Sequence, residues 1–120
     1  MSIEVVFEVD APLLRVKAIG KDENLEQVVA YGMQVIEAAL SHNCAHILCD
    51  ETELIYAIGT IDTYESAVLI SEAAPSIAKV AIVCNPDFYE DAAFWENVAV
   101  NRGLSVRAFK NMAEAEAWIQ

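Results

Sequence analysis

The sequence predicts one α/β domain over residues 1–120, with a mixed, mostly parallel sheet and the element order β-β-α-β-α-β-α-β-α. Three observations support this prediction. A chain of 120 residues is long enough for one hydrophobic core and too short for two. Two alternating apolar segments open the chain. After them, short apolar runs alternate with segments of helical periodicity, which is typical of parallel strands joined by right-handed crossovers.

The first two strands are expected at residues 3–9 and 13–19 as an antiparallel hairpin. Both segments carry apolar side chains at alternate positions, loosely in the first and cleanly in the second. Asp10-Ala11-Pro12 between them is a turn signal, and Gly20 closes the second strand.

A first helix is expected from Asp22 or Asn24 to about Leu40, because Asn24 and Gln27 have the spacing of a capping box. One face of this helix is apolar and contains Leu25, Val28, Val29, Gly32, Ile36, Ala39 and Leu40. Gly32 weakens a helix by about 1 kcal/mol relative to Ala. Its presence predicts a close approach to the sheet or to something bound there.

The centre of the chain contains the expected functional site. Ala45–Cys49 predicts a strand buried on both faces, and the acidic residues 50–53 are expected at its carboxyl end as a solvated group. Residues 54–61 form a connector that is more apolar than a solvated loop. A helix is expected to begin at Asp62, which has capping spacing to Glu65. Ligands of open α/β sheets lie beyond the carboxyl ends of strands, so the connector marks the expected site.

The second half continues the alternation of helices and strands. The helix from Asp62 is stopped by Pro75 and has a small inner face of Ala67, Ile70, Ala73 and Ala74. The central strand is residues 79–84. A third helix follows Asn85-Pro86-Asp87; its inner face is Phe88, Ala92, Trp95, Val98 and Ala99, and it ends at Arg102 and Gly103. Residues 104–109 form the last strand, and Asn111 with Glu114 caps a terminal helix.

The charge excludes some classes of partner. A formal net charge of −12 repels phosphate backbones and anionic lipid surfaces, which argues against nucleic-acid binding and leaves only transient apolar contact with a membrane. Residues 1–4 lack the basic start and apolar core of a signal peptide, and no segment approaches the ~18 apolar residues of a spanning helix, so the expected location is the cytoplasm. Cys44, Cys49 and Cys84 are expected to be reduced and buried.

Two long segments, Leu48–Ala67 and Val80–Ile119, resemble the SpoIIAA-like proteins, a bacterial family related in fold to STAS domains and compared with the CRAL-TRIO carriers of non-polar molecules. The most specific residues are Phe94-Trp95-Glu96, Asn101-Arg102-Gly103 and Ala117-Trp118. The resemblance extends from about Phe7 to Trp118. It implies a small α/β domain without known enzyme activity, which acts in regulatory interactions or carries an apolar ligand.

The sequence departs from the STAS pattern at one functional position. STAS anti-sigma-factor antagonists place an Asp-Ser or Asp-Thr pair, followed closely by Gly, at the start of the helix after the middle strand, where the hydroxyl is phosphorylated. Thr60 and Thr63 are hydroxyls near that place, but the motif is absent. Asp62 and Glu65 oppose a phosphate there, so a cap is the favoured role of these threonines.

Metal binding and catalysis are both poorly supported. His42, Cys44, His46 and Cys49 are metal-ligand types, but the turn and strand approach around them favour a structural role, and no second ligand pair accompanies them. The acidic residues Asp50, Glu51 and Glu53 lack a nucleophile, a positioned His or a Gly-rich phosphate loop. We therefore expect no enzyme activity, no metal and no cofactor.

The sequence leaves two functions open. The first is a non-enzymatic binding module that holds an apolar or lipid-like molecule in a cleft covered by the 54–61 connector. Its expected ligand contacts are Leu54, Tyr56, Ile58, Thr60, Ile61, Phe88 and Trp95. The alternative is a STAS-type regulatory domain that uses the same apolar surface for a homodimer or a protein partner. The aromatic residues of the third helix also fit an ordinary core.

Overall fold

The computed structural model describes residues 3–120. Within them, one five-stranded sheet has the strand order β1-β2-β3-β4-β5. The strands are β1 (Glu4–Asp10), β2 (Leu13–Asp22), β3 (His46–Tyr56), β4 (Lys79–Cys84) and β5 (Val106–Phe109). Strand β1 is antiparallel to β2 and all other neighbours are parallel, which confirms the predicted fold class and opening hairpin.

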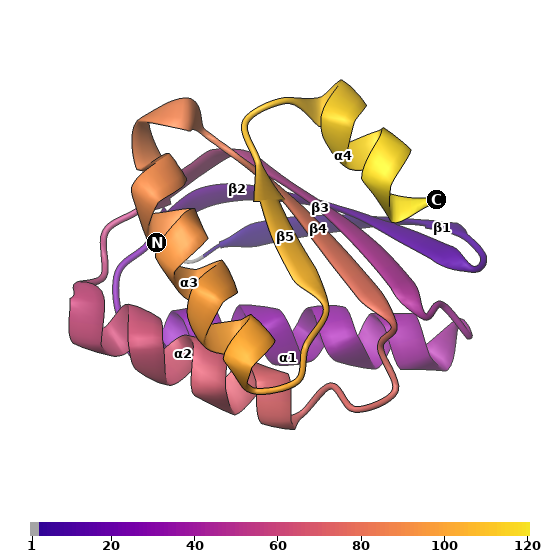
Figure 1. Ribbon diagram of the computed structural model, residues 1–120, viewed down its shortest axis with the longest axis horizontal. Coiled ribbons are helices and arrows are strands. Elements are labelled where there is room, and N and C mark those ends of the chain that lie inside the picture. The colour runs from indigo at the N-terminus through magenta and orange to yellow at the C-terminus, as the bar shows by residue number, and fades with distance from the viewer. Residues whose placement is uncertain (1–2) are drawn as a thin grey trace.

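Both faces of the sheet carry helices (Figure 1). The helices are α1 (Leu25–Ser41), α2 (Thr60–Glu72), α3 (Tyr89–Asn101) and α4 (Met112–Ile119), with a short 3-10 helix η1 (Pro86–Phe88) before α3. Ile47 and Ile82 pack in the core shared with α1, α2 and α3, whereas Leu48 and Val83 pack in the core under α4. Because adjacent strand residues face opposite ways, α4 covers the face opposite the other three helices. No helix within residues 3–120 has the length and apolar character needed to cross a membrane.

Two of the three predicted helix caps are confirmed. The Asn24 side chain accepts a hydrogen bond from the Gln27 amide at 2.9 Å, and Asn111 accepts one from the Glu114 amide at 3.1 Å. The predicted cap at Asp62 is wrong, because α2 begins two residues earlier with Gly59 as its N-cap. The Thr63 hydroxyl donates to the Gly59 carbonyl at 2.9 Å, which closes the first turn without a side-chain cap.

Strand β3 is longer than predicted. It continues through the acidic residues to Tyr56, because β2 also continues past Gly20 and supplies pairing partners, Gly20 opposite Leu54 and Asp22 opposite Tyr56. The connector between β3 and α2 is therefore residues 57–59. The expected connector over residues 54–61 is therefore wrong, because residues 54–56 pair with β2 in the sheet and residues 60–61 belong to α2.

A bulge in β3 changes the direction of its side chains. The pairing with β2 moves from Lys17 opposite Asp50 to Ile19 opposite Glu53, so β3 carries one extra residue here. The Thr52 amide and hydroxyl both donate to Asp50 Oδ1, at 3.1 and 2.7 Å. Side chains on both sides of the bulge consequently face the α1–α3 layer: Ile47, Cys49, Glu51, Leu54 and Tyr56.

The close approach expected at Gly32 is present, but it is made to α2 and not to the sheet. A Cβ at this position would lie 2.5 Å from Ile70 Cδ1 and 2.7 Å from Ile70 Cγ1. The absence of a side chain therefore lets α1 and α2 pack closely. Leu40 is 50% exposed, so the buried face of α1 ends at Ala39 and is completed by Val35.

Candidate functional site

An apolar cavity of about 110 Å³ lies between the sheet and the layer of α1, α2 and α3. Aliphatic side chains from helices and strands form most of its wall, among them Val35, Ile36, Ile47, Ile70, Val80 and Ile82. In β3 and β4, about every second side chain points toward this space. On the other side, the residues on one face of α1 and of α2 line it.

A buried carboxylate stands in the wall of this cavity. Glu51 is only 7% exposed, and its Oε2 accepts a hydrogen bond of 2.7 Å from the Tyr31 hydroxyl. The Tyr56 hydroxyl donates to Oε1. The Tyr31 bond ties α1 to β3. Burial raises the pKa of Glu51, the two tyrosine bonds oppose this rise, and the negative charge of Asp22 adds to it.

Asp22, at the end of β2, is a second buried carboxylate in the same wall. It is 5% exposed, and its Oδ1 accepts hydrogen bonds from the backbone amides of Ala57 and Ile58, the latter at 3.2 Å. These bonds hold the short connector before α2. Burial raises the pKa of Asp22, and Asp91 at the exposed start of α3 adds to the rise.

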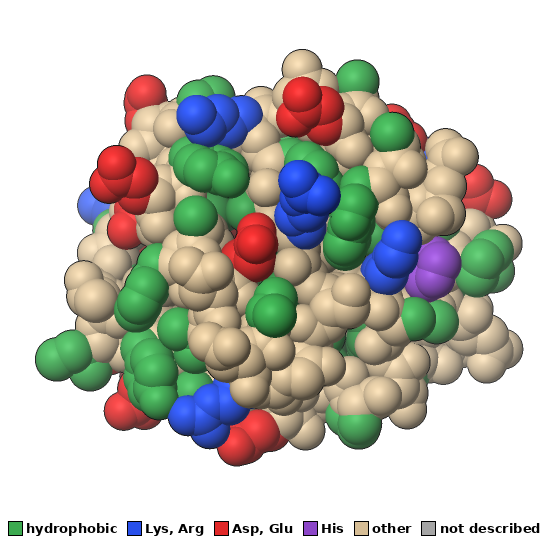
Figure 2. Space-filling model, in the orientation of Figure 1, with side chains coloured by type: hydrophobic (Ala, Val, Ile, Leu, Met, Phe, Trp, Pro, Cys, Tyr) green, Lys and Arg blue, Asp and Glu red, His purple; other side chains and the backbone are tan. Residues whose placement is uncertain are grey.

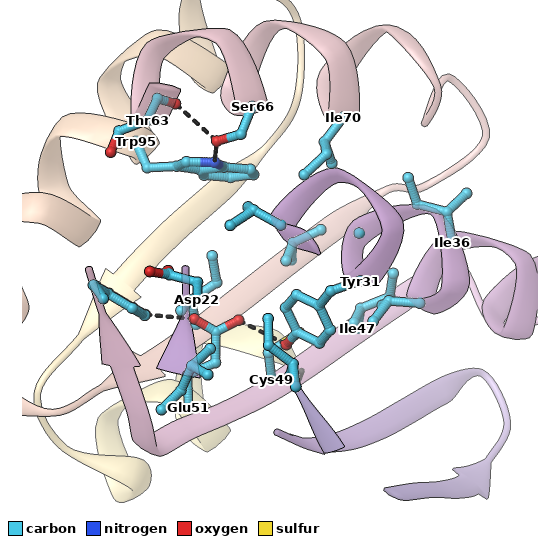
Figure 3. A pocket seen from close by; sticks show the side chains of 18 of the residues that line it. Asp22, Tyr31, Ile36, Ile47, Cys49, Glu51, Thr63, Ser66, Ile70 and Trp95 are labelled. Carbon is cyan, nitrogen blue, oxygen red and sulfur yellow. Dashed lines mark hydrogen bonds between the residues drawn. The ribbon is translucent and has the colours of Figure 1, made fainter. Parts of the chain in front are cut away.

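The indole of Trp95 lies on the α2 and α3 side of the cavity. Its Nε1 donates to Ser66 Oγ at 3.1 Å, and Ser66 Oγ donates to the Thr63 carbonyl at 2.8 Å. Figure 3 shows Trp95 and Ser66 on one side of the space, with Asp22, Glu51 and Tyr31 on the other. The Ser66 bond fixes the orientation of the indole ring against the cavity.

Solved structures share this architecture, and two of them do so along nearly their whole length. An anti-sigma factor antagonist from Mycobacterium paratuberculosis has a TM-score of 0.65 and 11% identity, over 98% of this chain and 94% of that one. An uncharacterised protein from Shewanella loihica, described as having a SpoIIAA-like fold, has a TM-score of 0.61 and 20% identity, over 99% of this chain and 94% of that one. The chain has a SpoIIAA-like fold. No family model matches the sequence, and no curated protein is significantly similar to it.

The SpoIIAA-like fold brings only part of the predicted site together. Leu54, Tyr56, Ile58 and Trp95 line the cavity, whereas Thr60, Ile61 and Phe88 do not. Ile61 is 76% exposed on α2. Phe88 in η1 packs against the Tyr56 ring, with 5.6 Å between the ring centroids. Thr60 is exposed and Thr63 is buried, so the two threonines differ in their access to a modifying enzyme.

Several polar residues of the cavity were not predicted from the sequence: Asp22, Tyr31 and Ser66, together with the burial of Glu51. Two signals were present. Tyr31 follows Val28 by three positions and therefore shares its helical face. Glu51 follows Ile47 and Cys49 at alternate positions, which is the spacing of one face of a strand.

The other two acidic residues of β3 have different surroundings from Glu51. Lys17 contacts Asp50 at 3.3 Å and Glu53 at 2.8 Å, and these are partly exposed ion pairs. This agrees with the solvated role expected for Asp50 and Glu53. The same expectation for Glu51 is wrong, because its side chain points to the α1–α3 face.

The metal-ligand residue types are not assembled in this domain. Among residues 3–120, no group of three or more His, Cys, Asp or Glu side chains is arranged to hold a metal ion. His42 is exposed at the end of α1, and the Cys44 thiol lies 3.6 Å from the His42 carbonyl. The three cysteines are free and buried, as expected; Cys49 and Cys84 lie in strands, and Cys44 precedes β3.

Proposed function

We propose that this SpoIIAA-like domain is a non-enzymatic regulatory module that docks a protein partner on the outer face of α2 and α3. The observation that carries the proposal is the set of large apolar side chains exposed there. Ile61 is 76% exposed, Tyr64 42% and Leu69 40% on α2, and α3 adds Phe94 and Val100. Figure 2 shows several hydrophobic side chains at the lower left, over α2. Exposed apolar side chains that gather in this way favour a contact surface.

The fold and the charge support the same proposal. One protein with this fold is named an anti-sigma factor antagonist, and this likeness favours a regulatory role for the chain. Acidic side chains on α2, namely Asp62, Glu65 and Glu72, surround the apolar ones. The partner is therefore expected to present an apolar patch with a rim of Lys and Arg.

The chemistry of the buried groups supports a role without catalysis. Burial raises the pKa of the Cys49 thiol, which disfavours the nucleophilic thiolate. The carboxylate of Glu51 is occupied by two tyrosine hydroxyls. Neither group is arranged as a nucleophile activated by a base.

Ile61→Glu tests the docking surface, with Val6→Glu as a matched control. Val6 is 64% exposed on β1, so both variants place the same charge on an exposed apolar position. We expect wild type and Val6→Glu to retain the same partner protein in affinity capture from source cells, and Ile61→Glu to lose it. Light scattering of the purified chain shows whether the partner is a second copy of the chain or a different protein. Equal capture by both variants would disprove the proposed surface.

The cavity supports a second function, the binding of a small apolar molecule. A cavity of about 110 Å³ is somewhat smaller than an engineered 150 Å³ cavity that binds benzene. Leu54, Tyr56, Ile58 and Trp95 are the proposed contacts. Ala74 also lines the space, so Ala74→Leu is expected to fill part of it and to reduce binding of toluene in a thermal-shift titration. If toluene stabilises neither protein, the cavity has no role as a ligand site.

A further inference from the structure

The cavity is aliphatic along most of its wall and acidic at one end. Asp22 and Glu51 are 5% and 7% exposed there, and Asp91 adds a third carboxylate at the exposed start of α3. No Lys, Arg or His is among the described residues that line the cavity. Two buried carboxylates without a neighbouring cation make this end of the cavity unfavourable for anions and favourable for a positive charge.

We propose that the cavity selects a small apolar amine, whose ammonium group lies between Asp22 and Glu51 while its hydrocarbon part fills the aliphatic space. The proposal rests on the ligand-binding function described above and adds the charge of the ligand. A carboxylate offers about four acceptor positions. The two tyrosine hydroxyls occupy one position on each oxygen of Glu51, so acceptor positions remain for an ammonium donor.

The aromatic side chains of the cavity fit the same ligand. Trp95 faces the acidic end across the space (Figure 3), and the hydroxyls of Tyr31 and Tyr56 lie beside Glu51. The indole therefore lies against the hydrocarbon part of the ligand. The hydrogen bond from Trp95 to Ser66 holds this ring in position before a ligand arrives. An anionic ligand would meet the charges of Asp22 and Glu51.

The size of the cavity sets the size of the ligand. By comparison with the benzene-binding cavity of 150 Å³, a space of about 110 Å³ holds a group of roughly one small ring. Benzylamine, benzyl alcohol and benzoate are therefore suitable probes, because they share a ring and differ in charge. Isothermal titration calorimetry with the full chain measures the three affinities at neutral pH.

We expect benzylamine to bind roughly tenfold or more tightly than benzyl alcohol, and benzoate to bind most weakly. Glu51→Gln keeps the size of the side chain, removes its charge, and is expected to abolish most of the preference for the amine. Glu53→Gln is the matched control, because Glu53 lies in the same strand, is 58% exposed and does not line the cavity. Its benzylamine preference is expected to equal that of wild type.

The possible outcomes test two claims separately: that the cavity selects amines, and that it binds a ligand. Equal binding of benzylamine and benzoate by the wild-type chain, or an unchanged preference in Glu51→Gln, would overturn the selection of amines while leaving an apolar ligand site. Binding of none of the three probes, nor of toluene, would overturn the ligand site itself. If Glu51→Gln does not fold, Asp22→Asn takes its place, since its side-chain carbonyl can still accept from the amides of Ala57 and Ile58.

Discussion

Removal of the Tyr31 hydroxyl tests whether Glu51 depends on its tyrosine partners. In Tyr31→Phe the ring stays and the 2.7 Å bond to Glu51 Oε2 is lost. Because a hydrogen bond to a charged group contributes about 1.5–3 kcal/mol, the free energy of unfolding should fall by about 2 kcal/mol. With a urea dependence of about 1–3 kcal/mol per molar, the midpoint of urea unfolding should fall by about 1 M.

The pH dependence of this loss has a definite sign. The Tyr31 bond favours charged Glu51 and so lowers its pKa, opposing the rise that burial causes. Without the hydroxyl, the pKa of Glu51 in the folded protein rises further. The difference in stability between wild type and variant should therefore be small near pH 4.5, the ordinary pKa of a glutamate. It should grow as the pH rises through the raised pKa values of Glu51 in the two folded proteins.

Urea unfolding at pH 5 and pH 8, followed by far-ultraviolet circular dichroism, measures both effects. Tyr64→Phe is the control, because its hydroxyl accepts a bond from Arg102 on the surface and the ring is 42% exposed. A change of less than about 0.5 kcal/mol is expected there. A Tyr31→Phe loss equal to that of the control, or one that shrinks with rising pH, would refute the view that this bond supports a buried carboxylate.

Three further predictions concern stability. Because burial raises the pKa of Glu51, the wild-type chain should lose stability as the pH rises from about 4.5 through the raised pKa, and Glu51→Gln should remove this part of the loss in a pH series of thermal unfolding. Ile70→Ala should cost about 2–5 kcal/mol in wild type but less in Gly32→Ala, because a Cβ at Gly32 would occupy space 2.5 Å from Ile70 Cδ1; additive losses would contradict this. Asn24→Ala should cost about 1 kcal/mol through loss of its 2.9 Å bond to the Gln27 amide, and an unchanged urea midpoint would contradict the cap.

The element order could be predicted from the sequence, because periodicity and helix caps depend on residues that are close together in the chain. Asn24 and Asn111 mark the starts of α1 and α4 through bonds to amides three residues away. The start of α2 was misplaced because Asp62 and Glu65 have cap spacing, although the helix begins at Thr60 with Gly59 as its N-cap. Spacing identifies a favourable cap, and it does not show that the chain uses it.

The cavity could be predicted only in part from the sequence, because it depends on contacts between segments that are far apart in the chain. Leu54, Tyr56, Ile58 and Trp95 were selected for their apolar or aromatic character, and all four line it. Its polar members required knowledge of the neighbours. The role of Asp22 depends on amides 35 and 36 residues later, and the role of Ser66 depends on an indole 29 residues later.

The acidic run of β3 shows how one extra residue changes the chemistry of this domain. Asp50 and Glu53 are three positions apart, yet both reach Lys17, because the bulge between them restores the same facing direction. Glu51 lies between them and points to the opposite face, among tyrosines. In a regular strand, positions 51 and 54 would face opposite ways. The bulge instead lets Glu51 and Leu54 line the same cavity, so an acidic group and an apolar wall come from one strand.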